Sequence, residues 1–81
     1  MRLDKYLKVS RIIKRRTVAN EACDTERVNV NGRRAKASYE IKEGDLVEIE
    51  FGNKTLKFIV KSINEKTTKA DASEMYQIIE E

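Results

Sequence analysis

The residues best suited to chemistry in this sequence are arginines and lysines, which cluster in two blocks of one sign. Residues 1–16 hold seven cationic side chains against Asp4 alone, and residues 27–36 hold four with no carboxylate. Such side chains can neutralise several phosphates at once, and arginine can hold a phosphate through two parallel hydrogen bonds. Residues 37–81 carry six cations and ten carboxylates, so the positive charge is segregated. We therefore expect a surface that binds a polyanion.

Solvation of an amphipathic helix is the simpler explanation of a cationic run, but here two runs of the same sign occur together. The chain has no tryptophan, two phenylalanines and three tyrosines, too few for a platform that stacks single-stranded bases. Recognition of structured RNA by shape and backbone contacts fits better. Tyr6 is expected in the core. The predicted RNA-binding residues are Arg2, Lys5, Lys8, Arg11, Lys14, Arg15, Arg16 and Thr17, with Arg33, Arg34 and Lys36 as a second region.

The sequence offers few residues suited to catalysis or to metal binding. The chain has no histidine, its three glycines are isolated, and Cys23 is its single cysteine. General bases near neutral pH, phosphate-cradling glycine loops and cysteine–histidine zinc sites are therefore missing. We predict a protein that is not an enzyme and has no cofactor, with Cys23 as a helix-packing residue. The lone thiol, and the lack of a signal-peptide or membrane-spanning pattern, predict a cytoplasmic monomer.

Hydrophobic spacing predicts two helices that would position the first cationic block. Leu3, Tyr6 and Leu7 mark one face of a helix over residues 2–9, in which Asp4 can pair with Lys8. A break is expected between Ser10 and residue 16. Thr17 is expected as the N-cap of a second helix over 18–24 that buries Val18 and Ala22, with Ala19 or Cys23 as further candidates.

From residue 27 the hydrophobic period changes to that of strands. Val28 and Val30 precede an Asn31-Gly32 turn, and residues 33–37 could return as a short strand. A turn at 43–45 precedes a strand over 46–51, with Val47, Ile49 and Phe51 on one face, which pairs with a strand over 56–63. A helical turn that opens at Asp71 and a terminal strand complete the chain. The prediction is an α+β fold, two short N-terminal helices packed on a small twisted antiparallel sheet, as one domain over 1–81.

These motifs together resemble a known family. Arg2-Leu3-Asp4-Lys5-Tyr6-Leu7, then Arg15-Arg16-Thr17-x-Ala19, then Val28-x-Val30-Asn31-Gly32 resemble the RNA-binding domain first described in small-subunit ribosomal protein number four. The match spans about residues 2–50, and residues 51–81 would complete the sheet. The resemblance implies two helices against a curved sheet, with RNA held by the helical face and the adjoining hairpin. The family often has glycine where Glu26 stands, so a positive φ there would be strained.

The whole chain is also similar to stand-alone bacterial members that act in ribosome-associated quality control, and to a related heat-shock protein that binds free large ribosomal subunits. This resemblance implies binding to large-subunit ribosomal RNA and to peptidyl-tRNA near the P site of a split ribosome. The partners would be a stalled large subunit and the factor that supports template-free alanine tailing. Two alternatives stay open: an RNA binder in another assembly or regulatory pathway, and a protein-interaction module that docks a basic partner on its acidic half.

Overall fold

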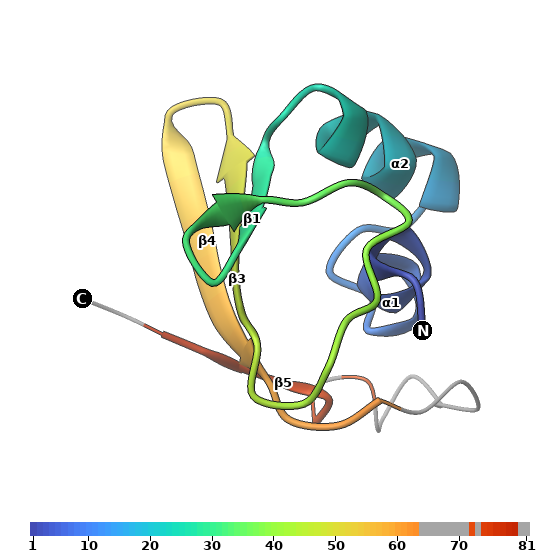
Figure 1. Ribbon diagram of the computed structural model, residues 1–81, viewed down its shortest axis with the longest axis vertical. Coiled ribbons are helices and arrows are strands. Elements are labelled where there is room, and N and C mark those ends of the chain that lie inside the picture. The colour runs from blue at the N-terminus through green and yellow to red at the C-terminus, as the bar shows by residue number, and fades with distance from the viewer. Residues whose placement is uncertain (64–71, 73, 80–81) are drawn as a thin grey trace.

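Two helices pack against a five-stranded antiparallel sheet in the computed structural model of this chain (Figure 1). The structure describes residues 1–63, 72 and 74–79. The strand order is β2-β1-β3-β4-β5. The predicted α+β fold is therefore confirmed. The elements are α1 (Leu3–Val9), α2 (Arg16–Asp24), β1 (Val28–Val30), β2 (Arg33–Arg34), β3 (Leu46–Phe51), β4 (Lys54–Val60) and β5 (Tyr76–Ile78).

The first helix forms as its spacing predicts. Leu3, Tyr6 and Leu7 share one face and are fully buried. The helix ends at Ser10, whose hydroxyl donates to the Leu7 carbonyl at 3.3 Å, and the chain then turns through Arg11 at φ 62°. The expected break before the second helix is therefore confirmed.

The start of the second helix differs from the prediction, and Thr17 is not its N-cap. Helix α2 begins at Arg16, because the Arg15 carbonyl accepts the first helical bond from Ala19 at 3.1 Å, and Arg15 forms no side-chain cap. Burial of Val18 was also wrong, since that side chain is 47% exposed. Ala19 and Cys23 face the core instead. These small side chains, four residues apart, allow α2 to approach α1 closely.

The first hairpin is confirmed, with a shorter return strand than expected. Asn31 and Gly32 have φ values of 54° and 82°, as a two-residue turn with two left-handed positions requires. Strand β2 stops after two residues rather than reaching Ala37, because the chain leaves the sheet to meet α1. There the carbonyls of Ala37 and Tyr39 accept the N–H groups of Asp4 and Leu3 at 3.2 and 2.8 Å.

The second hairpin and the terminal strand complete the sheet. Val47 and Ile49 are buried on the face toward the helices, whereas Phe51 extends past them and is 44% exposed. Strand β4 ends at Val60 rather than Ile63, and β5 pairs with it as the predicted terminal strand. The helical turn expected to open at Asp71 falls outside the described residues.

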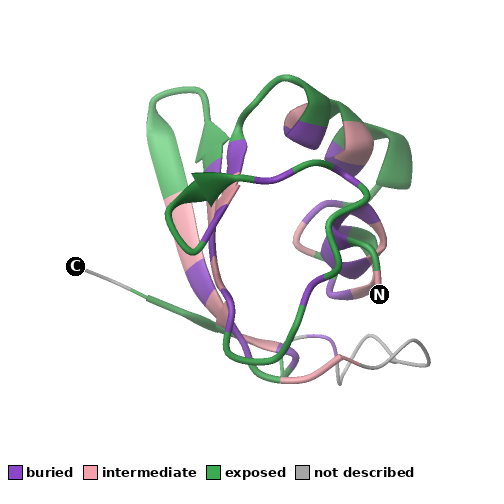
Figure 2. Cartoon of the chain, viewed as in Figure 1, coloured by how far each residue is buried: buried purple, intermediate pink, exposed green. Residues whose placement is uncertain are grey.

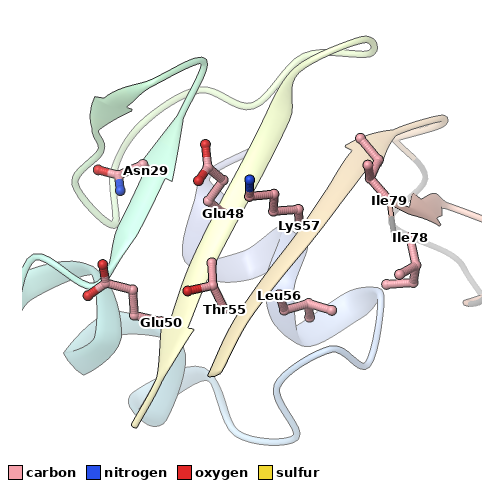
Figure 3. Close-up of a pocket in the computed structure, with 8 residues that line it drawn as sticks. All are labelled: Asn29, Glu48, Glu50, Thr55, Leu56, Lys57, Ile78 and Ile79. Carbon is pink, nitrogen blue, oxygen red and sulfur yellow. The ribbon is translucent and has the colours of Figure 1, made fainter. Parts of the chain in front are cut away.

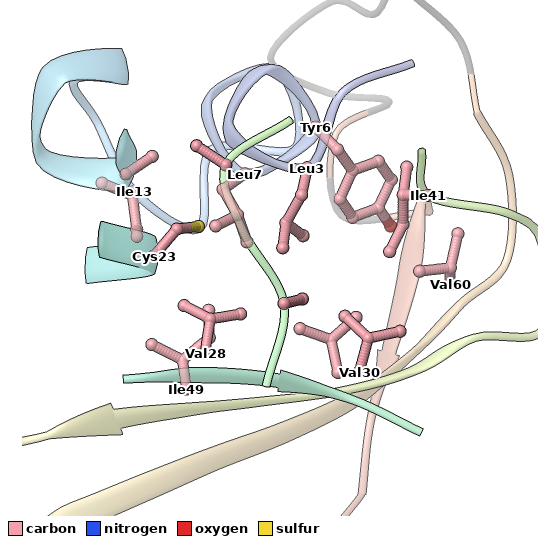
Figure 4. Packing of buried hydrophobic residues seen from close by; sticks show 14 of the residues in the cluster. Leu3, Tyr6, Leu7, Ile13, Cys23, Val28, Val30, Ile41, Ile49 and Val60 are labelled. Atoms are coloured by element: carbon pink, nitrogen blue, oxygen red, sulfur yellow. The ribbon is translucent and has the colours of Figure 1, made fainter. Parts of the chain in front are cut away.

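The core lies between the helical layer and the sheet (Figures 2 and 4). Tyr6 on α1 stacks on Phe58 of β4, with 6.4 Å between ring centroids, and its hydroxyl donates to the Met75 carbonyl at 2.8 Å. The predicted core positions of Tyr6 and Cys23 are confirmed. These contacts fix α1 against the sheet, so its outward side chains project from a rigid base.

Candidate nucleic-acid interface

A buried carboxylate joins the two helices at the centre of the first cationic block. Asp4 is 2% exposed and accepts hydrogen bonds from Nε of Arg2 at 3.3 Å and Nε of Arg16 at 3.4 Å. It also accepts from the Asn20 amide at 3.3 Å and from the Lys5 backbone N–H at 2.8 Å. The prediction that Asp4 pairs with Lys8 was therefore wrong. Its partners are Arg2, which directly precedes the helix, and Arg16, which the packing of α2 brings to it.

This arrangement orients the arginines without hiding them. The side chains of Arg2 and Arg16 stay 50% and 48% exposed. Within the described part of the chain, Arg16 uses only Nε toward Asp4, which leaves its two terminal nitrogens for a ligand. A guanidinium fixed in this way can bind a phosphate with little further loss of conformational entropy.

Asp4 stays ionised because its partners outweigh the effect of burial. Burial alone would raise the pKa of Asp4. The hydrogen bonds from Asn20 and from the Lys5 backbone, with the charges of Arg16 and Arg2, lower that pKa below its ordinary value of 3.8. The carboxylate is therefore a permanent anchor for both arginines at neutral pH.

The remaining predicted residues of the first block lie on α1, on the helix connection or at the start of α2. Lys8 is in the last turn of α1, Lys5 is half-buried one turn earlier, and Thr17 is exposed in the first turn of α2. The connection carries the exposed side chains Arg11, Lys14 and Arg15. All of these except Lys5 are exposed (Figure 2). Arg2 and Arg16 are joined through their contacts with Asp4. The other residues lie on the same two helices or on the connection between them.

The second cationic block lies at the β1–β2 hairpin and on the segment that follows it. Arg34 donates to the Glu26 carbonyl and lies 3.7 Å from its carboxylate, so it is held at the C-terminal end of α2. Lys36 lines the same hollow as Arg34 and Glu26. Arg33, Arg34 and Lys36 are all exposed. Glu26 has a φ of 62°, so the backbone at this family glycine position does adopt the left-handed conformation that strains a non-glycine residue.

Three residues at this surface were missed by sequence reasoning. Asp4 organises the two arginines, Asn20 donates to it, and Tyr39 is 36% exposed beside Arg33 and Arg34. The only sequence signal for Tyr39 was its place beside a cationic run. Asp4 carried a clearer signal, as a single carboxylate among seven cations.

A large hollow in the described part of the chain lies elsewhere. It is about 770 Å³ in volume and opens on the sheet face turned away from the helices (Figure 3). Its lining includes Glu48 and Glu50, which make it unsuited to phosphate. Residues 1–63, 72 and 74–79 contain no acidic or cysteine cluster able to hold a metal ion. No helix among them is long and apolar enough to cross a membrane.

Comparison with known proteins finds a matching family and relatives that cover this whole chain. The family model described as the S4 domain matches residues 1–47. The chain is 59% identical over 81 residues to the RQC P-site tRNA stabilizing factor of Streptococcus pneumoniae, covering all of this chain and 92% of that protein. It is 48% identical to the protein of the same name from Bacillus subtilis, covering all of this chain and 94% of that one.

A solved structure extends the likeness to the whole fold. The structure of Vibrio cholerae Heat Shock Protein 15, a trimer, superposes with a TM-score of 0.88 at 28% identity, covering 98% of this chain and 81% of that one. The motif, the fold and the full-length relatives agree with one another. This chain belongs to the S4 domain family.

Proposed function

We propose that this chain is an RNA-binding factor of ribosome-associated quality control that stabilises the P-site tRNA on a split large ribosomal subunit. The observation that carries the proposal is the pair of arginines, Arg2 and Arg16, oriented by one buried carboxylate at the surface shared by both helices. The names of the full-length relatives support the tRNA as ligand.

In this proposal the domain acts by binding and positioning, without catalysis, as a cytoplasmic monomer. Arg2, Lys5 and Arg16 would contact phosphates of large-subunit ribosomal RNA, together with Lys8, Arg11, Lys14, Arg15 and Thr17. Arg33, Arg34 and Lys36 would contact a second stretch of backbone on the bound RNA or on the tRNA. The tRNA would be held while a partner factor supports template-free alanine addition to the stalled chain.

Salt titration of RNA binding tests the proposal. An interface that neutralises about five phosphates should show a log–log salt slope on the order of −3 to −5. Replacement of Arg16 by alanine should weaken binding and make the slope shallower by about one unit. Lys54→Ala is the matched control, because Lys54 is exposed at the start of β4, beside the turn of the β3–β4 hairpin. It should leave the RNA affinity and the salt slope unchanged. No binding to tRNA or ribosomal RNA at low salt would refute RNA binding.

Sedimentation separates quality control from another RNA-binding pathway. Tagged protein from cells with stalled ribosomes should co-migrate with large subunits that carry tRNA, because the proposed ligands are the large-subunit RNA and the P-site tRNA of a split ribosome. Co-migration with assembly precursors alone would assign the chain to ribosome assembly instead. The Arg16→Ala variant should no longer co-migrate with the large subunits.

A further inference from the structure

A second hollow lies beside the β1–β2 hairpin, within the predicted RNA-binding surface. It is about 450 Å³ in volume, large enough for one nucleotide. Its lining residues are Val30, Asn31, Arg33, Arg34, Ala35 and Tyr39.

The lining combines an apolar floor, an aromatic wall and two cations. Val30 and Ala35 are 4% and 7% exposed, so they form the floor, while the ring of Tyr39 is 36% exposed. Arg33 and Arg34 are exposed at the hairpin. The Asn31 amide is already engaged, because its Nδ2 donates to Asp45 at 3.1 Å and its Oδ1 accepts the Leu46 N–H at 3.0 Å. These two bonds fix the orientation of the Asn31 amide, so the hollow offers mainly stacking and charge.

The segment that lines the hollow also contacts the start of α1. The Tyr39 carbonyl accepts the Leu3 N–H at 2.8 Å, and Arg2 pairs with Glu40 as a short antiparallel bridge. One segment therefore links the hollow to Arg2 (Figure 1, where residues 35–45 pass from β2 toward α1). We expect an RNA backbone held by Arg2 and Arg16 to extend along this segment toward the hollow.

We propose that this hollow receives one unpaired nucleotide of the bound RNA. Its base stacks on the ring of Tyr39 over the apolar floor, and its phosphate meets Arg33 or Arg34. Because every base has a stacking face, the stacking contact itself accepts any base. The inference rests on the proposed RNA binding and adds a preference for an extruded nucleotide over a fully paired helix.

Two RNA hairpins of identical stem test this inference, one fully paired and one with a single unpaired 2-aminopurine in the stem. Stacking of one base on an aromatic side chain is worth about fivefold or more in affinity. The wild-type protein should therefore bind the bulged hairpin at least fivefold more tightly and quench its 2-aminopurine fluorescence. Tyr39→Leu should abolish the preference and the quenching, with the affinity for the paired hairpin little changed. Tyr39→Phe should retain both.

The outcomes separate this inference from the proposed function. If the wild type binds neither hairpin nor tRNA, RNA binding itself fails. If it binds both hairpins equally, or if Tyr39→Leu retains the preference, RNA binding stands and the nucleotide site is refuted. Arg16→Ala should weaken binding to both hairpins by a similar factor, because Arg16 does not line the hollow and would contact the paired stem of each.

Discussion

Replacing Asp4 by asparagine distinguishes charge from geometry at the RNA-binding surface. The change removes a negative charge from the first cationic block, so a simple count of charges predicts tighter RNA binding. The structure predicts the opposite. An asparagine keeps one acceptor oxygen but turns an amide donor toward Arg2 or Arg16, which releases at least one guanidinium from its fixed position.

The size of the effect follows from the contacts of Asp4. Two charge-assisted bonds to half-exposed arginines contribute about 0.2–1 kcal/mol each, because solvent screens them. The bonds from Asn20 and the Lys5 N–H are retained only in part, so the total loss of folding free energy should be about 1–3 kcal/mol. Mobile arginines must be ordered on binding, at about 0.5–1.5 kcal/mol each. We therefore expect RNA affinity to fall about three- to tenfold.

The assay is RNA binding at fixed salt, with urea unfolding of the same variants. Glu21→Gln is the matched control, because Glu21 is exposed on α2 and loses the same charge. It should bind RNA as tightly as the wild type, or slightly more tightly. If Asp4→Asn bound RNA at least as tightly as Glu21→Gln, the positioning role of Asp4 would be wrong.

The pH dependence of stability provides an independent check on Asp4. Its folded-state pKa is lowered, so it contributes stability above its unfolded pKa of about 3.8. That contribution should disappear as the pH falls through the lower folded value. The stability difference between the wild type and Asp4→Asn should therefore shrink below pH 3.8. A constant difference down to acid unfolding would contradict this.

Three further predictions concern stability and reactivity. Glu26→Gly should raise the free energy of unfolding, measured by urea titration, by about 0.5 kcal/mol, because glycine adopts a φ of 62° without strain. The control Glu21→Gly, inside α2, should lower the free energy of unfolding by a similar amount. Tyr6→Phe should cost about 0.5–1.5 kcal/mol by calorimetry, since the Met75 carbonyl keeps two backbone donors after losing the phenol. Burial raises the pKa of the Cys23 thiol to about 11, so iodoacetamide should label Cys23 slowly in native protein and rapidly in urea.

Local sequence signals predicted most of the fold. The spacing of Leu3, Tyr6 and Leu7 defined α1, and the Asn31-Gly32 pair defined the first hairpin. Both signals depend on residues close in sequence, where helix and turn geometry decide which side chains meet. The same holds for the exposure of the cationic residues, because charged side chains are rarely buried without partners.

The errors arose where distant segments decide the outcome. Thr17 has the right side chain for an N-cap, but α2 begins at Arg16, whose guanidinium is held by Asp4 from the other helix. Val18 is larger than Ala19, yet the small residue faces α1, because close helix packing favours it. No pattern within a helical turn could have revealed either contact.

The segment between the hairpin and β3 connects the edge strand that carries Arg33 and Arg34 to the start of α1. Strand β2 ends early because the chain crosses to α1, where backbone carbonyls satisfy the N–H groups of Leu3 and Asp4 that the helix leaves unpaired. The crossing brings the backbone of Ala37 and Tyr39 against α1, and Glu40 pairs with Arg2. Arg33 and Arg34 stay on β2 at the edge of the sheet. Because β2 ends early, a short crossing links these two arginines to the neighbour of Arg2, as the proposed binding of one RNA to both blocks requires.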